Sequence, residues 1–76
     1  MQIKILFFGI LTEIIGASLV VNDVSDTDSL IKKLNAEYPA LQKLNYTIAV
    51  DQKIIIDNTV LNNGSIVALM PPFSGG

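Results

Sequence analysis

The chain has 76 residues and contains neither cysteine nor histidine, so neither a disulfide nor a zinc site of the usual kind can stabilise its fold. A domain of this size buries only about 60% of the surface that its unfolded chain exposes, so its core has to be rich in apolar residues. Half of the residues are hydrophobic, which meets that need and argues against disorder. The length allows one domain, and we expect a single hydrophobic core.

The same absences exclude several kinds of function. Without histidine or cysteine there is no Ser-His-Asp triad, no imidazole acid–base catalysis and no thiolate nucleophile. Five lysines, no arginine and a formal net charge of −2 argue against binding to nucleic acid, which needs clustered basic side chains. No apolar stretch reaches the roughly 20 residues of a membrane helix, and the N-terminus does not read as a signal peptide. We expect a soluble cytoplasmic protein with no metal site and no membrane partner.

The first half of the chain carries the patterns of two strands and two helices. Residues 2–8 alternate between two faces, which predicts a strand whose core positions are Ile3, Ile5 and Phe7. Residues 11–15 predict one or two helical turns, and residues 18–21 predict a second strand. The segment 25–29 is rich in Asp and Ser, which cap helices, and an apolar stripe follows it at Leu30, Ile31, Leu34 and Tyr38. Pro39 is predicted to end this helix.

Three further strands are predicted in the second half. Residues 46–50 alternate, residues 53–56 form a short apolar run, and residues 65–70 form the last strand. Turns are expected at Asp51 with Gln52 and at Asn63 with Gly64. One main helix and one short helix on a small mixed sheet give an α+β fold.

The last six residues differ from the rest of the chain. Two prolines directly follow the last strand, and neither can donate a hydrogen bond to a sheet. We therefore divide the chain into a folded domain, residues 1–70, and an extended C-terminal tail, residues 71–76. Pro71 and Pro72 restrict the base of the tail, and six extended residues reach on the order of 20 Å.

The only reactive group in the tail is the terminal carboxylate. It is an anion at neutral pH and a poor acyl electrophile, so another protein has to activate it, for example as a mixed anhydride with a nucleotide phosphate. Gly75 and Gly76 carry no Cβ, which lets the backbone enter a channel too narrow for side chains. The tail therefore has the features of an acyl carrier that is inserted into a partner.

Apolar residues also fall on the outward faces of the first and last strands. If the alternate positions form the core, Leu6 and Phe8 point outward, and so do Ile66, Ala68 and Met70. If the two strands lie side by side, these residues form one apolar patch at the root of the tail, which is typical of an interface. The alternative is that a second layer, or a different register, buries them.

Two segments of the sequence, taken together, match the pattern of a known family. Residues 70–76, with the sequence MPPFSGG, and residues 6–9, with the sequence LFFG, resemble the small subunit of molybdopterin synthase. The likeness covers nearly the whole chain, including the segments 11–16 and 30–38. The ending of two prolines and two glycines is specific, whereas a terminal diglycine alone also occurs in thiamin sulfur carriers and ubiquitin-like modifiers.

The resemblance implies the β-grasp, or ubiquitin-like, fold, a mixed sheet of four to five strands with one main helix and a short helix. It also implies a chain that is no enzyme on its own but the small subunit of a sulfurtransferase complex. In this family an activating enzyme adenylates the terminal carboxylate with ATP and magnesium, and a sulfur donor converts it to a thiocarboxylate. Sulfur then passes to a pyranopterin precursor in the large synthase subunit. The implied assembly is a heterotetramer, with no permanently bound cofactor on this chain.

Carried onto this sequence, the resemblance makes Gly76 the acyl site and Gly75 its spacer. The residues expected to dock the partners are Leu6, Phe8, Ile66, Met70, Pro71, Pro72, Phe73 and Ser74. Two turns depart from the family pattern. The family often has Asn where this chain has Asp51, and an Asp-Gly-Asp turn at residues 63–65. Because both differences lie in turns, the family's turn geometry and a contact with a partner at these turns are in doubt for this chain. The chemistry of the tail is not affected.

Three other functions remain open from the sequence. A carrier of the thiamin type would use the same terminal chemistry, although the length, the LFFG segment and the two prolines argue against it. A ubiquitin-like modifier would join Gly76 to lysines of other proteins. A plain interaction domain would carry an inert tail.

Overall fold

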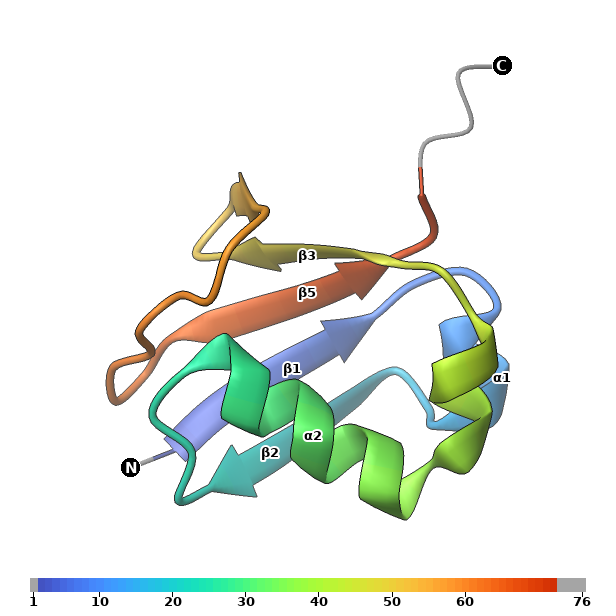
Figure 1. Cartoon of the computed structure of the whole chain (residues 1–76), viewed down its shortest axis with the longest axis horizontal. Coiled ribbons are helices and arrows are strands. Elements are labelled where there is room, and N and C mark those ends of the chain that lie inside the picture. Colours follow the sequence, from blue (N-terminus) through green and yellow to red (C-terminus); the bar gives the residue numbers. More distant parts are fainter. Residues whose placement is uncertain (1, 73–76) are drawn as a thin grey trace.

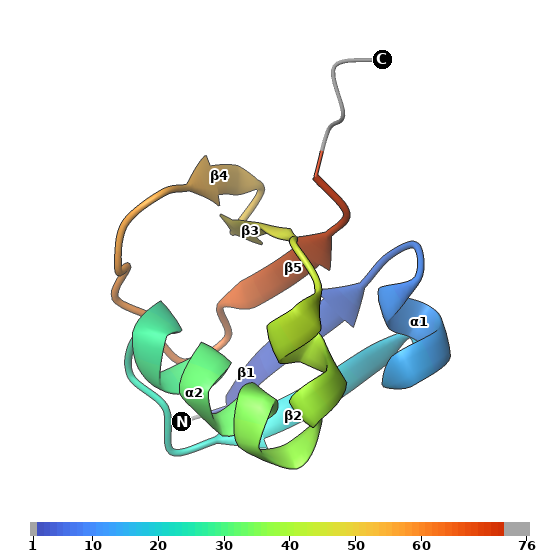
Figure 2. The same ribbon diagram turned by 45° about the vertical axis from the view of Figure 1, so that its right-hand side comes forward.

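A computed structural model describes residues 2–72 of the chain. In chain order the elements are β1 (Gln2–Phe7), α1 (Leu11–Ile14), β2 (Ser18–Asn22), α2 (Thr27–Glu37), the 3₁₀ helix η1 (Pro39–Lys43), β3 (Thr47–Val50), β4 (Lys53–Ile55) and β5 (Ile66–Met70). The five strands form one mixed sheet in the order β2-β1-β5-β3-β4, with β1 and β5 parallel at its centre and the outer pairs antiparallel. Helix α2 lies across one face of this sheet (Figure 1; Figure 2).

The hydrophobic core fills the space between the sheet and α2. The inward positions of β1 and β5 are almost completely buried, namely Ile3, Ile5, Phe7, Val67 and Leu69. Leu30 and Leu34 of α2 belong to the same core cluster, together with Leu11 of α1, Leu41 of η1 and Leu61 from the segment between β4 and β5. The alternation predicted for residues 2–8 and 65–70 is therefore confirmed, as is the α+β fold.

Helix α2 begins as the sequence predicts. Asp26 has an extended backbone, and its Oδ1 accepts a hydrogen bond of 2.9 Å from the backbone N–H of Ser29, which is N-cap geometry. The helix ends at Glu37, before Pro39. The sequence analysis did not assign the 3₁₀ helix η1 that follows, which has Pro39 in its first turn and buries Leu41.

The two predicted turns are also confirmed. Asp51 and Gln52 both have positive φ, 48° and 72°, and they join Val50 to Lys53 as a two-residue hairpin of the type whose twist matches its strands. Gly64 has a φ of 88° and precedes β5. The predicted strands differ from the observed ones by one residue at their ends, as at Ser65, which lies outside β5.

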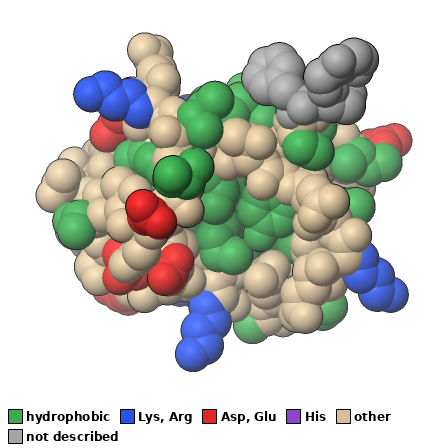
Figure 3. All heavy atoms as spheres, turned by 45° about the horizontal axis from the view of Figure 1, so that its top comes forward, with side chains coloured by type: hydrophobic (Ala, Val, Ile, Leu, Met, Phe, Trp, Pro, Cys, Tyr) green, Lys and Arg blue, Asp and Glu red, His purple; other side chains and the backbone are tan. Residues whose placement is uncertain are grey.

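The visible face in Figure 3 has hydrophobic side chains toward its middle and charged side chains mainly toward its rim. Several hydrophobic residues are only partly buried where they pack against the core. Within residues 2–72, no helix has the length and hydropathy needed to cross a membrane.

Candidate functional site

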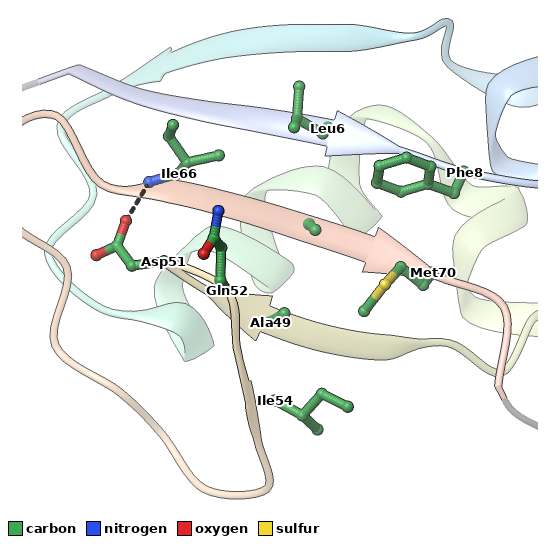
Figure 4. Close-up of a pocket in the computed structure, with 9 residues that line it drawn as sticks. Leu6, Phe8, Ala49, Asp51, Gln52, Ile54, Ile66 and Met70 are labelled. Atoms are coloured by element: carbon green, nitrogen blue, oxygen red, sulfur yellow. Dashed lines mark hydrogen bonds between the residues drawn. The ribbon is translucent and has the colours of Figure 1, made fainter.

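The face of the sheet that points away from α2 carries an apolar hollow of about 630 Å³. Its lining comes from the strands β1, β3, β4 and β5, from Phe8 directly after β1, and from the β3–β4 turn, as Figure 4 shows. The lining residues are Leu6, Phe8, Ala49, Asp51, Gln52, Ile54, Ile66, Ala68 and Met70. In the close-up the pale-green helix α2 lies behind the sheet, so the hollow is on the face opposite the core.

The strand register explains why this face is hollow. Ala68 in β5 pairs with Leu6 in β1 on one side and with Ala49 in β3 on the other. Two adjacent alanines leave a low floor, whereas the larger side chains around them rise above it. Alternation along each strand places all these residues on one face, because residues two apart point the same way.

Large apolar side chains at this hollow remain exposed. The exposed fractions are 45% for Phe8, 44% for Ile66 and 59% for Ile54. A single exposed apolar residue needs no explanation, whereas a group of them around one concavity is typical of an interaction surface. The alternative that a second layer or another register covers this patch is wrong for the described part of the chain.

Among the lining residues within the described range 2–72, Asp51 is the one with a charged side chain. Its Oδ1 accepts a hydrogen bond of 3.0 Å from the backbone N–H of Ile66, and its own N–H donates one of 2.8 Å to the Ile66 carbonyl. Asp51 therefore fastens the β3–β4 turn to the start of β5, which is a structural role for this departure from the family pattern. At the other departure, Asn63 Oδ1 accepts a hydrogen bond of 2.8 Å from the N–H of Gln2.

The structure brings four of the predicted docking residues together. Leu6, Phe8, Ile66 and Met70 line one hollow, because β1 and β5 are parallel neighbours. The condition on which the predicted patch depended, that the first and last strands lie side by side, is therefore met. Ile54, Ala49 and Gln52 also line it, and the sequence analysis did not single them out. The signal that could have found Ala49 is its alternation in β3, but its place beside Ala68 follows only from the register.

The predicted residues of the tail divide into two groups. Pro71 and Pro72 directly follow β5 and are exposed. The remaining four lie outside the described residues, and their predicted roles stay predictions: Phe73, Ser74, Gly75 and Gly76. The same holds for the division into residues 1–70 and 71–76. The described part of the site is thus an apolar surface next to two prolines, at the point where the C-terminal segment leaves β5.

A five-stranded mixed sheet of this order, with one main helix on one face, defines a protein of the β-grasp, or ubiquitin-like, class. This confirms the fold that the resemblance implied. A model of the ThiS family matches residues 5–76, and the chain belongs to this family.

Individual proteins agree with this assignment. The chain is 34% identical to the molybdopterin synthase sulfur carrier subunit of Chlamydomonas reinhardtii, with 100% of both chains covered. It is similar to a solved complex of subunits 1 and 2 of molybdopterin-converting factor from Helicobacter pylori 26695, with a TM-score of 0.76, 28% identity and 100% of both chains covered. The small archaeal modifier protein 1 of Methanosarcina acetivorans shares the fold, with a TM-score of 0.82, 21% identity and coverage of 99% of this chain and 96% of its own. The resemblance to the small subunit of molybdopterin synthase is therefore confirmed.

Proposed function

We propose that this chain is the sulfur carrier for the synthesis of molybdopterin. An activating enzyme adenylates the carboxylate of Gly76, a sulfur donor converts it to a thiocarboxylate, and the sulfur passes to a pyranopterin precursor in the large synthase subunit. The observation that supports this most directly is the exposed apolar hollow beside the end of β5, immediately before a C-terminal segment that ends in two glycines.

The chemistry follows from the state of the terminal group. A free C-terminus has a pKa of about 3.3 to 3.7, so at neutral pH it is a carboxylate and resists nucleophilic attack. Attack of its oxygen on the α-phosphate of ATP, with magnesium bound to the nucleotide, gives an acyl-adenylate and releases pyrophosphate. Hydrosulfide delivered by the donor then adds to the acyl carbon and AMP leaves, which gives the thiocarboxylate. ATP, magnesium and the donor are supplied with the activating enzyme, so this chain needs no resident cofactor.

Partner docking is assigned to the hollow. Leu6, Phe8, Ile66 and Met70 offer apolar surface that a partner can cover, and Pro71 and Pro72 fix φ where the chain leaves the sheet. Catalytic side chains are supplied by the large subunit, and this chain is the non-catalytic member of the complex. The Helicobacter pylori structure, a complex of subunits 1 and 2, supports a large-subunit partner. The assembly that we propose, a heterotetramer built from two such pairs, follows from the family resemblance.

Intact-mass measurement tests the first half of this proposal. The purified chain is incubated with an activating enzyme, ATP, magnesium and a sulfur donor, and a variant lacking Gly76 is the control. We expect the exchange of one oxygen for one sulfur in the full chain only. Failure of this exchange, with an activating enzyme shown to be active on another carrier, contradicts the proposal.

Two outcomes distinguish the other classes of function. Isopeptide-linked remnants of this chain on lysines of other proteins would favour a ubiquitin-like modifier. If the thiocarboxylate form of the chain supports thiazole formation but transfers no sulfur with the large synthase subunit, a carrier of the thiamin type is favoured.

A further inference from the structure

Gly9 and Pro71 are in contact although they are far apart in the sequence. Gly9 follows β1 and has a φ of 62°, in the left-handed region that favours glycine. A Cβ built on Gly9 would overlap Cγ of Pro71 and would lie 3.2 Å from its Cδ. The α-carbon of Gly9 therefore lies directly against the proline ring, at the first residue after β5.

The loop that carries Gly9 is held on both sides. The backbone N–H of Phe8 donates a hydrogen bond of 3.1 Å to the carbonyl of Leu69 in β5. The carbonyl of Gly9 accepts two hydrogen bonds from Thr12, one of 3.1 Å from the backbone N–H and one of 2.8 Å from the hydroxyl. Gly9 is thus fixed relative to both β5 and the start of α1, and it presents a defined surface to Pro71.

A displacement of the Pro71 ring also displaces the main chain at residue 71. Its ring closes on its own backbone nitrogen, so the ring cannot turn away from an obstacle as a flexible side chain would. A side chain at position 9 therefore has to displace either Pro71 or the Gly9 loop, and the hydrogen bonds of Phe8 and Gly9 hold the loop in place.

We propose that Gly9 is a positioning residue that sets the direction in which the C-terminal segment leaves the sheet. The inference rests on the proposed function, because that direction matters when Gly76 has to reach a partner's active site. The absence of a Cβ lets the Pro71 ring rest on the loop, which limits the backbone directions open to Pro71 before a partner docks. Fewer orientations before docking mean a smaller entropy loss on binding.

The chain offers a matched control for this proposal. Gly64 also has a positive φ, 88°, but a Cβ built there would meet no atom within 4 Å. Gly64 precedes β5 and Pro71 follows it, so Gly64 and Pro71 lie at opposite ends of this strand. Gly9→Ala and Gly64→Ala therefore share backbone strain, and only the first adds the overlap with Pro71. Gly9→Asn is a second variant, because Asn tolerates the left-handed region better than Ala does.

The test has a structural and a functional readout. In NMR spectra of the free protein we expect contacts between the Gly9 α-protons and the Pro71 ring, and altered residual dipolar couplings at residues 71–72 in the Gly9 variants. We expect the affinity for the large synthase subunit to fall roughly tenfold in Gly9→Ala and less than about twofold in Gly64→Ala, where tenfold corresponds to about 1.4 kcal/mol. Gly9→Ala with Pro71→Ala removes the overlapping ring atoms and should recover most of that loss relative to Pro71→Ala alone.

Either of two results overturns the proposal. One is an unchanged position of Pro71 together with unchanged affinity in both Gly9 variants. The other is an equal loss in Gly64→Ala, or no rescue by Pro71→Ala, since the effect would then reflect strain alone. If the unsubstituted chain itself does not bind the large subunit, the proposed function fails, while the NMR contacts still test the placement of Pro71.

Discussion

Ala49 and Ala68 are neighbours on β3 and β5, and their small side chains form the floor of the hollow. Leu6, Phe8 and Met70 around them are large, so the shape of the site depends on this contrast in size. Affinity in such interfaces comes mainly from apolar side chains that fill pockets, so a filled hollow should no longer accept a partner.

Ala68→Phe tests this at a single position. We expect the affinity for the large subunit to fall by roughly 10- to 100-fold, or about 1.4 to 2.8 kcal/mol, because the aromatic ring occupies the hollow. Val20→Phe is the control, since Val20 is an exposed residue of β2 outside the hollow. Titration by calorimetry measures both variants, and equal affinities would show that the hollow is not the docking surface.

Asp26 predicts a specific dependence of stability on pH. Hydrogen bonds from the side chain and the backbone of Ser29, and then from Asn58, lower the pKa of the Asp26 carboxyl from its ordinary 3.8. The unfolded chain therefore binds this proton more tightly, so the stabilisation is present above pH 3.8 and is lost as the pH falls through the lowered value. Asp26→Asn keeps a good N-cap without the charge.

Unfolding by urea between pH 7 and pH 2 measures this effect. We expect Asp26→Asn to lose less stability than the unsubstituted chain as the pH falls through the acidic range. A parallel decline in the two proteins would mean that the capping carboxylate does not contribute to the acid sensitivity.

At the scale of elements, the sequence predicts most of the fold because each local signal agrees with the final structure. The alternation in residues 2–8, the capping Asp26 and the Asn63–Gly64 turn all lie where the structure has them. The 3₁₀ helix η1 was not predicted, since one buried residue, Leu41, gives no periodicity to recognise. The lining of the hollow by Ile54 was missed for another reason, because it depends on the pairing of β3 with β5.

The buried side chain of η1 predicts that this short helix is part of the core. Leu41 is 1% exposed, whereas Ile56, a side chain of the same size, is 94% exposed. Leu41→Ala should lower the free energy of unfolding by about 2 to 5 kcal/mol, because it removes buried apolar atoms and leaves a cavity. Ile56→Ala should change it by about 0.5 kcal/mol or less.

Chemical denaturation compares the two variants. If Leu41→Ala costs no more than Ile56→Ala, η1 is not an integral part of the core.

At the scale of the whole molecule, the two faces of the sheet have different tasks. One face packs against α2 and forms the core, and the other carries the hollow next to the end of β5. The parallel strands β1 and β5 contribute to both faces, with buried residues in the core and outward-facing residues in the hollow. The C-terminal segment follows β5 directly, so the proposed docking surface and the proposed acyl site are separated by only a few residues of the chain.

The proposed chemistry requires that Gly76 is the last residue. One alanine added after Gly76 should abolish adenylation and sulfur transfer, because the carboxylate is then displaced by one residue and an adjacent Cβ enters the narrow channel. The same alanine added at the N-terminus is the control. Circular dichroism and thermal unfolding should be unchanged in both, and normal transfer by the extended chain would refute the role of Gly76.

The most direct measurement supplies the sulfur in advance. The chain is prepared with a C-terminal thiocarboxylate and mixed with the large synthase subunit and the pyranopterin precursor, without ATP or an activating enzyme. We predict that dithiolene product forms, with two carrier chains returned to the carboxylate for each pterin, as intact masses and product analysis would show. If the thiocarboxylate persists in a complex that is fully formed, or if product forms equally well from the carboxylate chain, the protein does not carry this sulfur.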